Sequence, residues 1–211
     1  MRGKLIVLYG IDGSGKSTVL NKLRESNINN TICTSCMTNS VFEEELYSAE
    51  KQLHFNRIDY FSKEFKHMLH IGSVIYNMHN SIIPILNSGK NVILDRYIMC
   101  ISIFTNIFLD KSYACISKAL ECLPSPDLGI YFDVEIDTAI KRIQKRNEIN
   151  GTSLHYSERR DSLVLKKEQY ESLIPYEEYS ILRIDANQEI NTVHSSVLEL
   201  LKNTGFNRTS L

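Results

Sequence analysis

The strongest constraint on the fold is the glycine-rich segment YGIDGSGKST, which begins at Tyr9 and follows the apolar run KLIVL almost without a break. Residues 10–17 satisfy the pattern G-x-x-x-x-G-K-[ST], with a strand-like run before it and a helix-like segment after it. Glycines permit the backbone conformations that point successive N–H groups inward, and the N-terminus of the following helix adds its positive end. The segment therefore predicts a phosphate-binding loop rather than a mere tight turn.

The residue types in this loop fit a nucleoside triphosphate such as ATP. Lys16 can reach the β and γ phosphates, and Ser17 can supply a hydroxyl to Mg²⁺. We expect ATP to contact Gly10, Gly13, Ser14, Gly15, Lys16, Ser17 and Thr18. The Asp12 carboxylate would repel a bound phosphate unless its side chain faces away from it. In that orientation it can accept a hydrogen bond from a second substrate's hydroxyl or orient an arginine. An Asx turn that only stabilises the loop is the alternative.

Apolar runs alternate with longer segments of helical period, which predicts an α/β fold in one domain spanning residues 1–211. We expect a central five-stranded parallel sheet, with helices on both faces, from strands at 4–9, 31–34, 91–94, 128–134 and 181–184. The first, third and fourth runs are continuously apolar and should be central. Helices are expected at 17–25, 61–87, 138–148 and from about 158, with a kink or break near Pro84 and a polar loop at 147–157.

Charge and composition restrict the partners. The formal net charge is −1, which argues against nucleic acid or an acidic membrane surface as a partner. The first apolar run is too short for a signal sequence or a membrane span, so we expect a cytoplasmic protein. The five cysteines, at positions 33, 36, 100, 115 and 122, predict no disulfide framework. Cys33 and Cys36 have the spacing of a metal pair, but a zinc site needs four ligands, so buried thiols are favoured.

A second candidate site follows the third predicted strand, which ends in Asp95-Arg96-Tyr97. Ligands of open α/β sheets lie at the carboxyl ends of the strands. Asp95 could hold Mg²⁺, directly or through water, and Arg96 offers a fork for a substrate phosphate. A structural ion pair between the two is the alternative.

Three stretches together resemble the thymidylate kinase family of nucleoside monophosphate kinases: GIDGSGKST, IIPILNSGKNVILDRY and PDLGIYFDVEIDTAIKRIQKR. The tail YSILRIDANQEINTVHSSVLELL is similar to that family's last strand and helix, so the resemblance covers most of the chain. It implies a three-layer P-loop kinase fold with a lid, here at about 146–160. It also implies transfer of the γ-phosphoryl group of Mg·ATP to a (deoxy)nucleoside monophosphate such as dTMP, and a homodimer.

The resemblance also implies residue roles. Asp12 would contact the acceptor's sugar 3′-hydroxyl, Arg96 its phosphate, and Asp95 would belong to the Mg²⁺ shell. Arg142 would lie against adenine and Arg146 would reach the transferred phosphoryl group, although two arginines at i, i+4 are also typical of a solvated helix face. Because position 13 is glycine, any catalytic arginine should come from the lid. Lys16, Arg96 and Arg146 are thus the predicted catalytic residues, with no general base required.

The acceptor half departs from the family. Counted back from Pro84, the positions of the usual base-stacking Phe and base-binding Arg are His70 and Val74. An altered acceptor base is therefore expected to be possible, with these two residues as candidate readers, although a lone helical histidine can equally be structural. Two alternative functions remain open: a deoxynucleoside kinase, which would need a carboxylate base for a sugar hydroxyl, and a P-loop nucleotide-binding module without a small-molecule acceptor.

Overall fold

The computed structural model describes residues 1–37, 48, 51–52, 61–109 and 118–204. Its strands form one parallel sheet in the order β2-β3-β1-β4-β5. Their bounds are β1 Leu5–Tyr9, β2 Thr31–Thr34, β3 Asn91–Asp95, β4 Leu128–Asp133 and β5 Ile181–Asp185. All five strand predictions are confirmed, and the first, third and fourth strands hold the three central positions as expected.

The central strand β1 shows why these runs are continuously apolar. Val7 is in register with Leu94 of β3 on one side and with Gly129 of β4 on the other. All five residues of β1 are buried, because helices cover both faces of the sheet. The register places the carboxyl ends of β1 and β3 side by side. The glycine-rich loop follows β1, and Asp95 is the last residue of β3, so the two lie next to each other.

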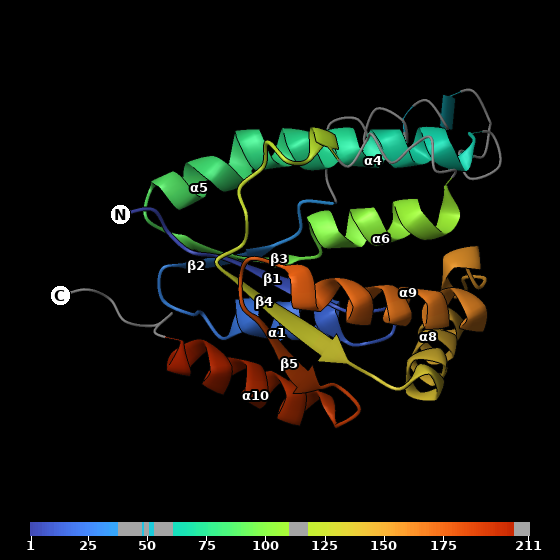
Figure 1. Ribbon diagram of the computed structural model, residues 1–211. Helices are drawn as coiled ribbons and strands as arrows, with labels where there is room; N and C mark the ends of the chain where they lie inside the picture. The colour runs from blue at the N-terminus through green and yellow to red at the C-terminus, as the bar shows by residue number, and fades with distance from the viewer. Residues whose placement is uncertain (38–47, 49–50, 53–60, 110–117, 205–211) are drawn as a thin grey trace.

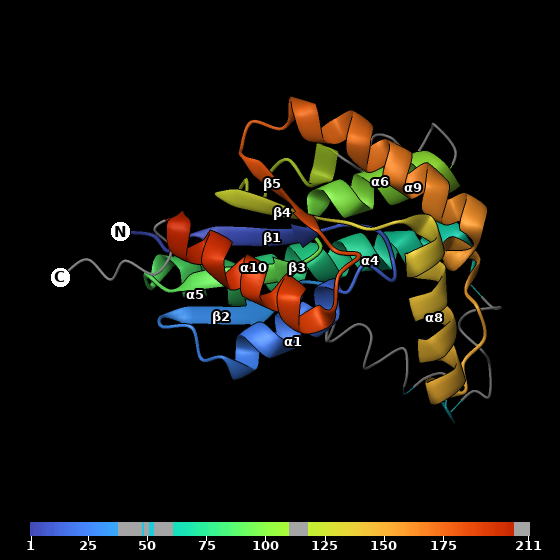
Figure 2. The same cartoon turned by 90° about the horizontal axis from the view of Figure 1, so that it is seen from below.

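Helices form the two outer layers (Figures 1 and 2). One face of the sheet is covered by α1 and α10, and the other by α4, α5, α6 and α9. Helix α8 stands beyond the carboxyl ends of the strands, opposite the two termini. The helix bounds are α1 Lys16–Glu25, α4 Lys63–Asn77, α5 Ile83–Asn87, α6 Ile98–Phe108, α8 Ile136–Asn150, α9 Arg160–Leu173 and α10 Ile190–Asn203.

Two of the expected helical segments have different bounds in the structure, and α6 was not expected. The segment expected as one helix at 61–87 is α4 followed by the π-helical turn η1 (Met78–Ile82) and then α5, so the break lies just before Pro84. Helix α8 runs to Asn150, so the loop expected from residue 147 begins later. The helix ends where Gly151 adopts a φ of 64°, a left-handed conformation that favours glycine.

The cysteine and membrane expectations can be compared with the described residues. Cys33 and Cys36 are buried, and burial raises the pKa of their thiols to about 11 and about 12, so both stay protonated at neutral pH. Cys115 lies outside the described residues. No cluster of three or more His, Cys, Asp or Glu suited to a metal occurs in the described ranges. None of the helices described there has the length and hydropathy needed to cross a bilayer; the cytoplasmic location stays a prediction.

Candidate active site

The glycine-rich loop joins β1 to α1 in a conformation that only glycine accommodates at two points. Gly13 has a φ of 79°, and a Cβ there would lie 2.5 Å from the Ala139 carbonyl oxygen. Gly15 has a φ of 91° and caps the N-terminus of α1. No larger residue, arginine included, fits at position 13 of this chain. The geometric reason for glycine at position 13 is therefore the close approach of α8 to the loop.

Lys16 folds back over the loop. Its Nζ donates to the Ile11 carbonyl at 2.7 Å and to Ser14 Oγ at 2.9 Å. The side chain is buried, and burial, together with the positive charge of Arg96, lowers its pKa to about 8. This buried ammonium lacks a direct carboxylate contact among the described hydrogen bonds and ion pairs, so an anionic ligand would supply the missing negative charge.

A cavity of about 440 Å³, here called the loop cavity, lies between the loop, α8 and the segment that joins β5 to α10. It is lined by Asp12, Gly13, Gly15, Lys16, Ser17, Thr18, Arg96, Arg142, Ile143, Arg146, Gln188, Glu189 and Ile190. Every residue of the sequence-based ATP set lines it except Gly10 and Ser14, which are buried. Such a basic, glycine-walled cavity suits a triphosphate.

The two α8 arginines lie in this cavity but have different partners. Arg142 donates to the carbonyl oxygens of Ala186 at 2.8 Å and Gln188 at 3.1 Å, which fixes its guanidinium against the β5–α10 segment. Arg146 forms an ion pair with Glu158 at 2.7 Å. Arg142 is thus held by backbone carbonyl oxygens as one wall of the cavity, whereas Arg146 is paired with a carboxylate of the segment after α8.

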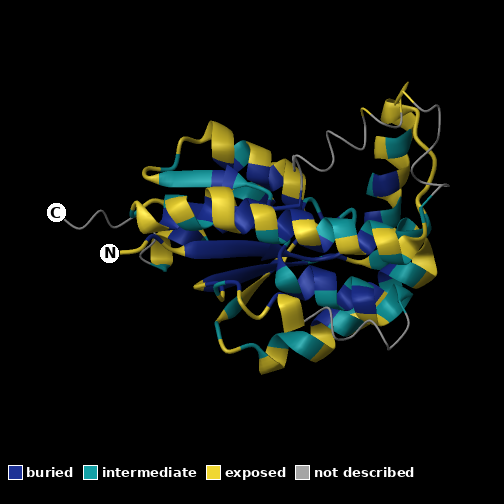
Figure 3. Ribbon diagram, turned by 90° about the horizontal axis from the view of Figure 1, so that it is seen from above, coloured by how far each residue is buried: buried dark blue, intermediate teal, exposed yellow. Residues whose placement is uncertain are grey.

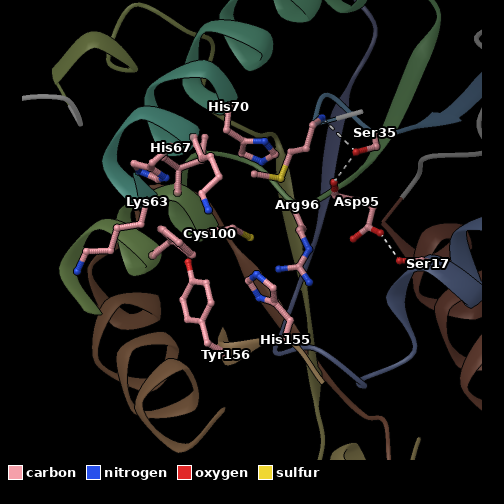
Figure 4. A pocket seen from close by; sticks show the side chains of 14 residues that line it. Ser17, Ser35, Lys63, His67, His70, Asp95, Arg96, Cys100, His155 and Tyr156 are labelled. Carbon is pink, nitrogen blue, oxygen red and sulfur yellow. Dashed lines mark hydrogen bonds between the residues drawn. The ribbon is translucent and has the colours of Figure 1, made fainter. Parts of the chain in front are cut away.

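A second cavity of about 510 Å³, here called the α4 cavity, opens beside α4 and α6 (Figure 4). It is lined by Ser17, Ser35, Met37, Lys63, Lys66, His67, His70, Asp95, Arg96, Cys100, Ile101, Phe104, His155 and Tyr156. His70 points into it from α4, and His155 and Tyr156 approach from the segment after α8. Ser17 and Arg96 line both cavities, so the two spaces meet at these side chains.

Asp95 and Arg96 at the end of β3 do not form an ion pair with each other. Asp95 Oδ2 accepts a hydrogen bond from Ser17 Oγ at 2.5 Å. Its other oxygen, Oδ1, is buried and has no hydrogen-bond partner among the described residues. Arg96 has a φ of 69°, a conformation that non-glycine residues rarely adopt and that turns its side chain toward the loop.

Asp12 is the partner of Arg96. One carboxylate oxygen accepts from the Arg96 guanidinium, and the other accepts from Lys166 Nζ at 2.6 Å. Burial alone would raise the pKa of Asp12, but the charges of Arg96 and Lys166 outweigh it and hold the pKa well below its ordinary range. Asp12 is therefore ionised, and in this structure it orients an arginine, one of the two roles predicted for it.

The two candidate base readers are placed differently. His70 lines the α4 cavity, in a stripe with Lys63, Lys66 and His67. Val74 lies one turn further along α4, is fully buried in the core and does not line either cavity. Ile71 and Val74 both face the core, and His70 is the last α4 residue that lines the cavity.

The family model for thymidylate kinase matches residues 8–197 of the chain, which includes every element of this site. The chain belongs to the thymidylate kinase family. A thymidylate kinase of Ligilactobacillus salivarius is 28% identical over 210 residues, covering 96% of this chain and 99% of the relative. A probable thymidylate kinase of Methanosarcina acetivorans is 33% identical over 164 residues, covering 70% and 73%.

Solved thymidylate kinase structures share the fold. The Candida albicans enzyme aligns with a TM-score of 0.71 and 21% identity, covering 98% of this chain and 94% of that one. The Ehrlichia chaffeensis enzyme aligns with a TM-score of 0.67 and 19% identity, covering 95% and 100%. The α/β P-loop kinase fold is confirmed, and the protein is a phosphotransferase: an ATP-dependent nucleoside monophosphate kinase of thymidylate kinase type.

The structure adds site residues that the sequence did not single out. Lys166 comes from α9, and Phe104, His155 and Tyr156 form an aromatic rim of the α4 cavity. His67 stacks on Phe104 with ring centroids 4.9 Å apart, and burial lowers its pKa to about 4, so it is neutral. The sequence pattern that could have found Lys166 is its spacing from Leu163 and Tyr170, which places a lysine on an otherwise apolar helix stripe.

Proposed function

We propose that the loop cavity binds Mg·ATP, that the α4 cavity binds a nucleoside monophosphate, and that the γ-phosphoryl group passes between them at Ser17 and Arg96. The observation that carries this assignment is that these two side chains line both cavities. In-line transfer requires two substrates held end to end with their charge neutralised and water kept out. The two cavities meet at Arg96, so substrates bound in them would lie end to end with a positive charge between them.

The protein's own groups can perform the transfer without a general base, because the acceptor phosphate oxygen is already a nucleophile. Lys16 would bind the β and γ phosphates, and Arg96 would bind the acceptor phosphate. Arg146 would leave Glu158 as the segment at 146–160 closes over the triphosphate, and Arg142 would provide a fixed wall for the adenine. Lys16, Arg96 and Arg146 would thus place positive charge where negative charge develops in transfer.

The carboxylate and hydroxyl at the meeting point of the cavities fit a magnesium ion. A buried carboxylate oxygen without a partner costs free energy unless a ligand satisfies it, and Asp95 Oδ1 is such an oxygen. Ser17 Oγ lies beside it, and Mg²⁺ needs only one or two protein oxygens beside phosphates and water. When bound, Mg²⁺ would neutralise phosphate charge; Ser17 and Asp95 would hold it.

Replacing Asp95 with Asn should raise the Mg²⁺ concentration needed for half-maximal activity about tenfold, a typical cost of perturbing a metal's ligand environment. Titration of MgCl₂ at saturating ATP measures the change. Asp133→Asn is the matched control, because Asp133 also ends a central strand but pairs with Lys167 and Arg183 outside both cavities. An unchanged Mg²⁺ requirement in Asp95→Asn would contradict the assignment.

We propose dTMP as the first acceptor to test, because the relatives that match are thymidylate kinases. The α4 cavity presents His70 and Tyr156 to a base, and its other polar groups could also receive a substituted pyrimidine. A panel of ribo- and deoxynucleoside monophosphates, with 5-substituted pyrimidines included, should be assayed for ADP release from Mg·ATP. Preference for dTMP supports the assignment, and preference for another nucleotide would show that the His70 cavity has altered specificity. No turnover with any of them would contradict it.

We propose that the protein is a homodimer through the outer face of α4. Phe65, Met68 and Tyr76 are 44%, 48% and 38% exposed, and they lie at helical spacing on one side of this helix. Gly72 lies between them with open space where a Cβ would be. An exposed apolar stripe of this kind can pack against the same stripe of a second copy around a two-fold axis, which makes a second copy of the chain its proposed occupant.

Replacing Met68 with Glu should convert the dimer to a monomer, because two like charges would face each other across the two-fold axis. Molar mass from light scattering during size-exclusion chromatography measures this directly. Leu165→Glu is the control, since Leu165 is 47% exposed but lies on α9. A wild-type protein that is already monomeric at assay concentration would contradict the proposal.

A further inference from the structure

The buried lysine of α9 occupies a position where the helix pattern calls for an apolar side chain. Leu163, Lys166 and Tyr170 form the buried stripe of α9, and the Lys166 side chain is only 9% exposed. A lysine is almost never buried unless it is paired. Its Nζ donates to Asp12 Oδ2 at 2.6 Å and to the Ser157 carbonyl at 2.8 Å. One ammonium group thus joins the phosphate loop to the segment after α8.

Attachment of α9 to the sheet does not depend on this contact. The adjacent Lys167 donates to Asp133 Oδ1 at 2.7 Å and to the Val134 carbonyl at 2.8 Å, which ties the same helix to the end of β4. An apolar residue at position 166 would pack with Leu163 and Tyr170 at lower desolvation cost. The charge of Lys166 is therefore better explained by what it does to Asp12.

The Asp12 carboxylate pairs with two cations, Arg96 and Lys166. Of these two, Arg96 is the one with a proposed role in binding a substrate. Arg96 lines both cavities, whereas Lys166 lines neither. Arg96 contacts Asp12 through one guanidinium nitrogen, so an acceptor phosphate that draws this nitrogen into a bidentate contact competes with Asp12 for it. With Lys166 in place, Asp12 stays neutralised after Arg96 moves. Without Lys166, the phosphate would have to compete with Asp12 for Arg96, and its success would leave an unpaired carboxylate in the wall of the loop cavity.

We propose that Lys166 is a positioning residue for the acceptor: by neutralising Asp12 it frees Arg96 to bind the acceptor phosphate, and through Ser157 it couples this exchange to the segment at 146–160. The inference rests on the proposed function. It assigns no contact between Lys166 and the substrate, since Lys166 acts through Asp12. The consequence is specific to one substrate: loss of Lys166 should weaken acceptor binding and leave ATP binding unchanged.

Lys166→Met tests this, since methionine keeps the volume and suits the apolar stripe. The variant should unfold at a lower temperature than the wild type, because Asp12 and the Ser157 carbonyl lose a buried partner, but Arg96 still pairs with Asp12. We expect its KM for the acceptor to rise about tenfold, within the range of measured coupling energies, with the KM for ATP changed less than about twofold. Lys167→Met is the matched control and should leave both KM values near those of the wild type. An unchanged acceptor KM in Lys166→Met, or an equal rise in Lys167→Met, would overturn the inference.

A double-mutant cycle with Asp12→Asn separates positioning from mere packing. If Lys166 acts through the carboxylate, Lys166→Met in the Asp12→Asn background should weaken acceptor affinity less than about twofold. Acceptor Kd measured by calorimetry keeps the cycle readable even if Asp12→Asn is inactive. The same loss in both backgrounds would overturn the inference. Wild-type turnover distinguishes failure of the proposed function from failure of this inference. If the wild type turns over no acceptor, the proposed function is contradicted. If the wild type turns over normally and Lys166→Met has an unchanged acceptor KM, only this inference is overturned.

Discussion

Replacing Lys16 with Met should lower kcat about 10³-fold, at the upper end of the loss expected for removal of one preorganised transition-state donor. Lys16 is the buried cation of the loop cavity, held over the loop by the Ile11 carbonyl and Ser14 Oγ. Steady-state kinetics with saturating acceptor and Mg·ATP measure the loss. Because burial lowers the pKa of Lys16 to about 8, its charge costs folding free energy at neutral pH. The variant should therefore unfold at the wild-type temperature or above it.

Lys22→Met is the control for this prediction. Lys22 lies in the last turn of the same helix, outside both cavities, and its loss should change kcat less than about twofold. A Lys16→Met variant that keeps a tenth or more of wild-type kcat would mean that the loop does not bind the transferred phosphate.

Replacing Arg96 with Met should lower kcat/KM for the acceptor about 10²-fold to 10³-fold, because this arginine is the cation at which the two cavities meet. Arg96→Lys should recover part of the loss, since it keeps the charge but not the two-pronged contact with a phosphate. The left-handed backbone at Arg96 is strained for any side chain, so neither variant relieves it. Kinetics with the acceptor varied at saturating ATP distinguish a KM effect from a kcat effect.

Arg183→Met is the control, because Arg183 also holds two carboxylates, Glu171 and Asp133, but lines neither cavity. It should lower stability slightly and leave kcat/KM for the acceptor within about twofold. Equal losses in Arg96→Met and Arg183→Met would mean that Arg96 is structural rather than part of the transfer site.

The sheet and the loop could be read from the sequence because local patterns determine them. A strand covered on both faces needs a continuous apolar run, and residues 4–9 and 91–94 have such runs. The phosphate loop needs glycines at fixed positions, and here Gly13 and Gly15 do adopt left-handed conformations. Figure 3 shows the buried residues concentrated in the sheet and the inner faces of its helices, as these runs indicate.

Other features depend on contacts between residues far apart in the chain. Lys166 meets Asp12 across 154 positions, and no local pattern records that pairing. Val74 was expected at the acceptor by counting back from Pro84, but its side chain is buried in the core, and the count along the chain does not show which face of α4 packs there. Helix α6 was not expected, because its residues are apolar nearly all round and show no helical period.

The central claim, that the γ-phosphoryl group of ATP passes to an acceptor phosphate at the junction of the two cavities, is tested most directly by following that group. The enzyme should be incubated with γ-labelled ATP, Mg²⁺ and dTMP, and the labelled products separated by chromatography. The account predicts the label in thymidine diphosphate, with little inorganic phosphate. Label released only as inorganic phosphate, or transferred to a nucleoside but to no nucleoside monophosphate, would contradict it.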